Sequence, residues 1–256
     1  MLRPSRLWAL EVEYDGAPFM VWQRQKHGLA IQQVMEEAGA KLRGGKKGEV
    51  VASGRTDAGV HALAQVVQME LPELPPFRLR EALNYHMKPH PVAVLRVCPA
   101  PEGWNARFSA IWRSYRYIIS NRNVPPMLEA NRVWHVRAAL DAAAMHRAAQ
   151  TLLGHHDFSS FRASACQAKS PMRTLDECNV RREGERIIIE ARARSFLHHQ
   201  VRNIVGSLKM VGEGSWPEAR VAEVLEAKNR AVAGPTAPPE GLYFTAVAYD
   251  PPLDLV

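Results

Sequence analysis

Residues 49–71, EVVASGRTDAGVHALAQVVQMEL, hold two apolar runs separated by a short polar segment. The runs at 49–53 and 64–71 carry β-branched valines next to turn-forming residues, a pattern that is typical of β-strands. Between them, Gly54 and Gly59 can adopt backbone torsions that other residues avoid. We therefore expect two strands joined by a loop in which the backbone bends sharply.

The sequence on either side extends this pair of strands into a βαββαβ unit. A strand is expected at 7–16, and apolar residues at helical spacing predict a helix at 31–43. A proline begins a second expected helix at 76–87, and a further strand follows at 91–99. This order of elements is that of the ferredoxin-like fold.

The remaining chain predicts a second βαββαβ unit with one extra strand and one extra helix. It opens with a strand at 111–120, and a hairpin is expected around Glu183-Gly184. The other elements are helices at 140–154, 196–212 and 217–229, and strands at 132–136, 175–183, 186–194 and 241–250.

We therefore predict an α+β protein of two domains, 1–105 and 106–256. The two ferredoxin-like, RRM-like halves are expected to form a continuous mixed, mostly antiparallel sheet, with the helices on one face and a central cleft. The uncovered face of such a sheet binds looped or single-stranded RNA in RRM modules. Packing of that face on another subunit is the ordinary alternative.

Composition restricts the class of protein. The chain has 256 residues, of which 46% are hydrophobic, with a formal charge of +7 and a pI of about 9.5. This excess of positive charge favours a polyanionic partner such as nucleic acid, although a solvated basic surface has the same composition. Three cysteines without CxxC spacing indicate neither a disulfide framework nor a zinc site. A signal-peptide core and apolar runs of about 18 residues are missing, so we expect a cytoplasmic protein without membrane contact.

Asp57 is the candidate catalytic residue of the loop, and Arg55 lies two positions before it. Loops between strands commonly carry catalytic side chains, and an arginine can keep a carboxylate ionised or contact phosphate. An aspartate in an Asp-Ala-Gly turn also commonly caps its own backbone, so the residues alone leave both roles open. GGKKG at 44–48 lacks the spacing and the hydroxyl of a nucleotide-binding loop.

The segment SGRTDAGVHALAQVV closely resembles the signature of the tRNA pseudouridine synthase A family. The resemblance continues along almost the whole chain, through EYDGAPFMVWQRQ, WNARFSAIWRSYRYII, LLGHHDFSSFR, FLHHQVRNIVGSL and PEGLYF. It implies an isomerase that converts uridine to pseudouridine at positions 38, 39 and 40 of the tRNA anticodon stem-loop. It also implies that the enzyme needs no cofactor or metal and acts as a homodimer.

Within this resemblance, Asp57 matches the aspartate that performs covalent catalysis. A carboxylate can attack the sugar at C1′, or assist elimination at C2′, while uracil leaves as a stabilised anion. Attack on C6 of the base is a third possibility that the sequence does not decide. The target uridine must be flipped out of its stem, at a cost of a few kcal/mol.

Four further residues match family positions that bind the substrate. Arg55 matches the arginine thought to occupy the space that the base vacates or to hold the RNA backbone, and Tyr115 matches the tyrosine that stacks on the uracil. Arg202 matches the arginine that pairs with the catalytic aspartate, and Leu242 matches an apolar residue of the uracil pocket. Without the resemblance, a core tyrosine, a solvated arginine and a core leucine also explain the last three residues.

Basic residues in two loops are candidate phosphate contacts, although a solvated charge explains any one of them as well: Arg43, Lys46, Lys47, Arg181 and Arg182. The histidine pairs 155–156 and 198–199 lack the i, i+4 spacing of a helical metal site, and we assign them no chemistry.

Two positions depart from the family pattern. Val21 stands where a glycine usually precedes Trp22, and valine resists a positive φ. Gln200 stands where a methionine usually precedes VRN, which can alter a contact near Arg202. Neither change removes a catalytic group.

Two other functions remain as alternatives. An RNA-binding module without catalysis would use the basic surface and the aromatic residues of the strands, but it would have no need of Asp57. A hydrolase of N-glycosidic bonds would need a positioned water and usually a second carboxylate, and no second acidic residue stands out near the loop.

Overall fold

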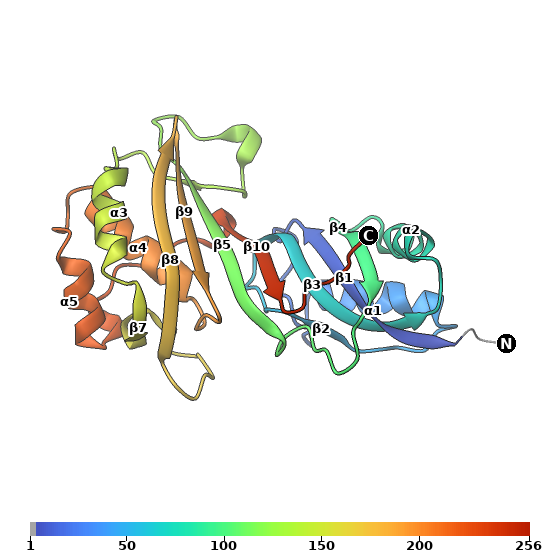
Figure 1. The fold of residues 1–256 in the computed structure, drawn as a ribbon. Coiled ribbons are helices and arrows are strands. Elements are labelled where there is room, and N and C mark those ends of the chain that lie inside the picture. Colours follow the sequence, from blue (N-terminus) through green and yellow to red (C-terminus); the bar gives the residue numbers. More distant parts are fainter. Residues whose placement is uncertain (1–3) are drawn as a thin grey trace. The chain divides into compact units, whose positions relative to one another are not determined.

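The computed structural model describes residues 4–256, which divide into two compact units (Figure 1). The first unit comprises the chain up to Ile111 together with Phe244–Val256, and the second comprises Trp112–Tyr243. The first unit is therefore discontinuous in the sequence. The division into domains 1–105 and 106–256 stays a prediction.

The first unit contains a βαββαβ arrangement. Its elements are β1 (Ser5–Tyr14), α1 (Ile31–Leu42), β2 (Val50–Ala52), β3 (His61–Pro72), α2 (Pro76–Met87) and β4 (Val92–Pro99). β1 pairs antiparallel with β3 and with β4, and β2 pairs antiparallel with β3. The order β4-β1-β3-β2 is ferredoxin-like, which confirms the prediction from the sequence for this half.

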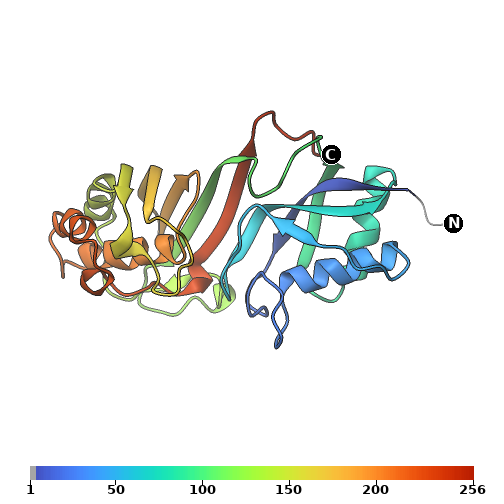
Figure 2. The same ribbon diagram turned by 90° about the horizontal axis from the view of Figure 1, so that it is seen from below.

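The two helices of the first unit cover one face of its strands (Figure 2). α1 buries the apolar stripe that its spacing predicted, Ile31, Val34, Met35 and Ala38. α2 buries a shorter stripe, Leu79, Leu83 and Met87. At the edge strand β4, Val97 and Val256 exchange two backbone hydrogen bonds of 2.9 and 3.1 Å, which covers part of that edge.

The second unit holds the remaining elements, two of which cross its boundaries. They are β5 (Ala110–Ser120), β6 (Trp134–His135), α3 (Ala142–Gln150), β7 (Gly154–Asp157), β8 (Met172–Glu183), β9 (Arg186–Ala193), α4 (Gln200–Gly212), α5 (Arg220–Ala227) and β10 (Leu242–Tyr249). Short 3₁₀ turns lie at Met127–Glu129, Ser159–Phe161, Arg230–Val232 and Pro239–Gly241. From residue 4 to residue 256, the helices are too short or too polar to cross a bilayer.

The described strands belong to one ten-stranded sheet in the order β4-β1-β3-β10-β5-β9-β8-β7, with β2 beside β3 and β6 beside β5. The run β10-β5-β9-β8 repeats the ferredoxin-like order. β5–β9, β9–β8 and β8–β7 are antiparallel and β6 is parallel to β5. The predicted α+β fold with a mixed, mostly antiparallel sheet is therefore confirmed, whereas the central cleft stays a prediction.

Several elements differ from the prediction in their bounds: the helix expected at 217–229 is only α5, and the strand expected at 132–136 is only β6. The expected helix 196–212 begins only at Gln200, because His199 adopts a left-handed backbone with a φ of 61°. The expected helix 140–154 is reduced to α3, whose N-terminus is capped by Asp141, which accepts a hydrogen bond from Ala144 N at 2.9 Å. The residues after it form β7, a strand without an alternating apolar pattern that pairs with β8.

Candidate active site

Asp57 lies in the loop 53–60, which joins β2 to β3 in the first unit. Its side chain is half-buried and Arg55 is exposed, whereas Thr56 between them is only 5% exposed. This alternation is that of an extended chain, in which successive side chains lie on opposite sides. After Asp57 the chain turns. Val60 N donates to the main-chain oxygen of Asp57 at 3.2 Å, and Gly59 supplies a φ of 75°.

Buried polar side chains fasten this loop to β1 and β3. The hydroxyl of Tyr14 lies 2.8 Å from Thr56 Oγ1. The amide nitrogen of Gln65 donates to the carbonyl oxygen of Gly54 at 2.6 Å, and its amide oxygen accepts from the hydroxyl of Ser53. All four side chains are at most 5% exposed. Burial raises the pKa of Tyr14 well above its usual value, despite opposing hydrogen bonds from Thr56 and Gln65, so the phenol stays protonated.

The segment after β1 also supports the loop. Trp22 N donates to the carbonyl oxygen of Thr56 at 3.1 Å. Gly16 approaches the loop so closely that a Cβ there would lie 2.0 Å from the carbonyl oxygen of Val60. Val21 does not adopt a positive φ, and it forms an isolated bridge with Ala30. The valine at this position is therefore accommodated without the backbone strain that the sequence suggested.

Tyr115 lies on β5, opposite Ala191 of β9. Its half-buried ring meets Phe196 edge to face, with the ring centroids 5.1 Å apart and the planes at 88°. Tyr117 is fully buried, and its hydroxyl donates to the carbonyl oxygen of Pro238 at 2.7 Å. Burial also raises the pKa of Tyr117, which keeps this hydroxyl a donor. Tyr117 is thus a core residue, and Tyr115 is the more accessible of the two.

Arg202 lies in the first turn of α4 and is half-buried. Its Nε donates to the carbonyl oxygen of Ala237 at 2.8 Å, and its own carbonyl oxygen accepts from Ala237 N at 3.1 Å. The segment before β10 lies close to α4, because a Cβ at Gly206 would be 1.6 Å from the carbonyl oxygen of Pro235. The guanidinium is therefore fixed at Nε by the backbone of its own unit.

Leu242 is the first residue of β10 and is 6% exposed. The residue before it, Gly241, leaves room for the ring of Tyr117, since a Cβ there would lie 2.6 Å from two ring carbons. The segment 237–242 therefore contacts both Arg202 and Tyr117 within the second unit. Burial of Leu242 agrees with a core position as well as with a pocket wall.

Gln200 replaces the usual methionine with a buried amide. Its oxygen accepts from Leu197 N at 2.8 Å, which closes the turn before α4. Its amide nitrogen is buried and has no hydrogen-bond partner among residues 4–256. The departure from the family pattern thus adds a turn contact two residues before Arg202.

The candidate phosphate contacts have different surroundings. Lys46 and Lys47 are exposed. Arg43 lies 3.5 Å from the carboxylate of Glu70, Arg181 pairs with Glu183 and Glu190, both at 2.6 Å, and Arg182 donates to the Leu140 carbonyl oxygen at 2.6 Å. The two lysines therefore remain the simpler candidates, because an arginine that already pairs within the protein gains less from a phosphate.

Arg55 and Asp57 thus share one loop of the first unit, and Tyr115, Arg202 and Leu242 belong to the second. The buried residues that hold the loop, Tyr14 and Gln65, were not among the predicted site residues. A signal was present in the sequence, because Gln65 is a polar residue at an inward position of a valine-rich strand.

Comparisons with known proteins find one family and many close relatives. The sequence profile of a family described as tRNA pseudouridine synthase matches residues 11–109 and 148–250. The tRNA pseudouridine synthase A of Acidiphilium cryptum is 61% identical over 247 residues, covering 96% of this chain and 97% of the relative. The proteins of the same name from Rhodospirillum centenum and Gluconobacter oxydans are 57% and 51% identical, covering 94% of this chain and 99% and 89% of the relatives.

Proposed function

Because this chain belongs to the tRNA pseudouridine synthase A family and is an isomerase that acts on tRNA, we propose that it modifies uridines 38, 39 and 40 of the anticodon stem-loop. We propose further that Asp57 is the nucleophile and that the target uridine is flipped out of the stem. The observation that carries this proposal is the loop 53–60, which holds a half-buried carboxylate between two glycines on a backbone fixed by buried hydrogen bonds.

The chemistry needs only a carboxylate at the start. The bond between N1 of uracil and C1′ of the ribose breaks, and the aspartate holds the sugar by attack at C1′ or assists elimination at C2′. The released base turns and C5 attacks C1′, which releases the carboxylate from the sugar or, after elimination, returns the proton to C2′. The proton of C5 then passes to solvent, and N1 takes up a proton. Attack of the carboxylate on C6 of the base remains a variant of the same scheme.

The other site residues have proposed roles in holding the flipped nucleotide. Tyr115 stacks on the uracil, a contact worth about 1–3 kcal/mol, which offsets much of the flipping cost. Arg55 occupies the space left in the stem, and Leu242 forms an apolar wall for the base. The proposed role of Arg202 is to pair with Asp57, which keeps the carboxylate ionised and fixes its rotamer.

The proposed partner surface is basic. The net charge of +7 favours tRNA, and phosphate contacts are proposed first for Lys46 and Lys47, with Arg43, Arg181 and Arg182 as weaker candidates. The reaction requires no cofactor or metal, and the proposed location is the cytoplasm, where tRNA is available.

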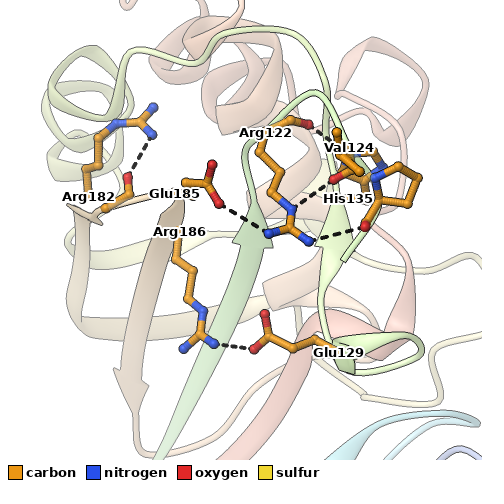
Figure 3. A network of polar contacts seen from close by, with 9 residues as sticks. Arg122, Val124, Glu129, His135, Arg182, Glu185 and Arg186 are labelled. Atoms are coloured by element: carbon orange, nitrogen blue, oxygen red, sulfur yellow. Dashed lines mark hydrogen bonds and ion pairs between the residues drawn. The ribbon is translucent and has the colours of Figure 1, made fainter. Parts of the chain in front are cut away.

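We also propose a homodimer, which an exposed apolar loop supports. The apolar side chains of this loop are Val124, Met127 and Leu128, the last 98% exposed. Arg122 donates to the carbonyl oxygen of Val124 at 2.8 Å, and Glu129 pairs with Arg186, so polar contacts hold the loop in place (Figure 3). Exposed apolar groups on a fixed loop are typical of protein interfaces.

The catalytic proposal is tested with tRNA that carries tritium at uracil C5. The isomerase releases tritium to water without free uracil, a hydrolase releases uracil, and an RNA-binding module does neither. Asp57→Asn, which keeps the size of the side chain, is expected to abolish release while tRNA binding persists. Asp176→Asn, which changes an exposed aspartate on β8, is the matched control and should keep full activity. Activity of Asp57→Asn would refute the proposed nucleophile.

Light scattering tests the dimer. The expected mass is twice the 28.6 kDa of the chain, and Leu128→Glu should lower it, whereas Phe77→Glu, at an exposed position of α2, should not. A single-chain mass for the unmodified protein at micromolar concentration would refute the homodimer.

A further inference from the structure

We propose that Tyr14 and Gln65 are positioning residues, which set the direction of Asp57 through the loop backbone without contacting the substrate. The inference depends on the proposed role of Asp57 as nucleophile. It assigns a catalytic consequence to a buried hydrogen-bond network that joins β1, β3 and the loop 53–60.

Thr56 is held both at its side chain and at its carbonyl oxygen. Its side-chain oxygen lies 2.8 Å from the hydroxyl of Tyr14, and its carbonyl oxygen accepts from Trp22 N at 3.1 Å. A residue held at its side chain and its carbonyl cannot rotate without breaking one of these bonds. Thr56 is buried, whereas Arg55 is exposed and Asp57 is half-buried, so holding Thr56 inward keeps its two neighbours toward the outside of the loop.

Gln65 holds the start of the loop with both the oxygen and the nitrogen of its amide. Its oxygen accepts from the hydroxyl of Ser53, and its nitrogen donates to the carbonyl oxygen of Gly54 at 2.6 Å. Gln65 is completely buried in β3. Leaving a buried amide without partners costs about 1–3 kcal/mol, so Gln65 favours the observed conformation of the loop.

At Gly54 the loop backbone can change conformation if this hydrogen-bond network is lost. Glycine visits torsions that other residues avoid, so the backbone at Gly54 depends on its hydrogen bond from Gln65 for a single conformation. The hydroxyl of Tyr14 is protonated at neutral pH, as any phenol is, and it is buried, so it offers Thr56 a constant partner.

The expected consequence is a slower chemical step. A nucleophile misplaced by about 1 Å can cost about a hundredfold in rate. Neither Tyr14 nor Gln65 is exposed at the surface, so RNA binding should not depend on them. A positioning role therefore predicts a fall in kcat with little change in KM, whereas a purely structural role predicts loss of folded protein with a normal rate per folded molecule.

The test measures kcat and KM for tritium release from tRNA, together with the single-turnover rate, for Tyr14→Phe, Thr56→Val and the double variant. Each single change should lower kcat by about 10–100-fold with KM within about twofold of the unmodified enzyme. The double variant should be no slower than the slower single one, because both changes remove the same bond. Thr56→Ser keeps the hydroxyl and should restore most of the rate.

The matched control is Tyr249→Phe, which removes a buried hydroxyl that donates to the Ala106 carbonyl oxygen at 2.7 Å. It should lower the melting temperature as Tyr14→Phe does but leave kcat unchanged. An unchanged kcat in Tyr14→Phe, or additive losses in the double variant, would overturn the proposal. If Tyr14→Phe does not fold, the comparison of Thr56→Ser with Thr56→Val decides it in the same way. Inactivity of Asp57→Asn together with full activity of Tyr14→Phe would reject the positioning role alone, whereas activity of Asp57→Asn would reject the proposed function.

Discussion

Replacing Gly206 by alanine is expected to destabilise the second unit, although the same change usually favours a helix. Gly206 lies in α4, four residues after Arg202, and faces the segment before β10. A Cβ at this position would lie 1.6 Å from the carbonyl oxygen of Pro235 and 2.8 Å from its carbonyl carbon. Both atoms belong to the backbone, so rotation of a side chain cannot relieve the contact.

The magnitude follows from two ways of accommodating the methyl group. For the new Cβ to lie 3.0 Å from the Pro235 oxygen, the segment before β10 must move by about 1.4 Å. That movement breaks the hydrogen bonds of 2.8 and 3.1 Å between Arg202 and Ala237. Two such bonds contribute about 2 kcal/mol, and retaining the strain instead costs about 1–3 kcal/mol. Alanine regains about 1 kcal/mol of helix propensity. The net loss is about 1 kcal/mol if the bonds break and up to about 2 kcal/mol if the strain is retained, or up to about 8 °C in melting temperature.

Gly212→Ala in the same helix is the control. There the nearest atom is Sδ of Met145 at 2.6 Å, at the flexible end of a side chain that can move. We expect its melting temperature to change by less than about 2 °C, measured by circular dichroism. Gly206→Ala should also slow tritium release, since it displaces the backbone that fixes Arg202. A melting temperature for Gly206→Ala at or above that of Gly212→Ala would refute the reasoning.

Three other predictions follow from charge and burial. Burial would raise the pKa of Cys166, but backbone N–H groups and Arg162 outweigh it and lower that pKa, whereas burial raises the pKa of Cys178 to about 12. Iodoacetamide at pH 8 should therefore label Cys166 before Cys178, as measured by peptide mass spectrometry. Preferential labelling of Cys178 would contradict this prediction. The double variant Lys46→Ala, Lys47→Ala should bind tRNA with a weaker salt dependence in filter-binding assays. The slope of log K against log salt concentration should fall by about 1 for each lost phosphate contact, and an unchanged slope would exclude both contacts. Burial alone would raise the pKa of Glu190, but hydrogen bonds from two arginines lower it. The stability it provides is therefore present above the unfolded pKa and lost as the pH falls through the folded pKa. Glu190→Gln should melt no more than about 3 °C lower at pH 7, and this difference should narrow as the pH falls from 7 to 3; a difference of the same size at pH 7 and pH 3 would contradict this assignment.

The sequence predicts those parts of the fold whose signals are local. The apolar stripe of α1 and the valine-rich runs of β2 and β3 appear in the chain where the structure has these elements. β7 is different, because GHHD has no apolar alternation and becomes a strand only through its pairing with β8. The start of α4 is also beyond local pattern, since the left-handed torsion of His199 depends on contacts such as that of Ala163 N with the His198 carbonyl oxygen, at 3.0 Å.

In the candidate site too, the sequence predicts some features and not others. The loop with Asp57 is evident from its glycines and its position between strands, and its family signature is continuous in the sequence. The support of that loop by Tyr14 is not evident, because 42 residues separate Tyr14 from Thr56. Their contact follows from the antiparallel register of β1 and β3, which only the folded sheet establishes.

The discontinuity of the first unit affects how the protein is made. Residues 244–256 complete that unit by adding β10 beside β3, but a ribosome produces them only after all of Trp112–Tyr243. Until then the nascent polypeptide presents an edge of β3 that β2 covers only opposite residues 67–69, and such an edge invites mispairing with other chains. Cutting the gene at one point does not give two complete units. To express the first unit separately, residues 244–256 must be fused to the segment that ends at Ile111.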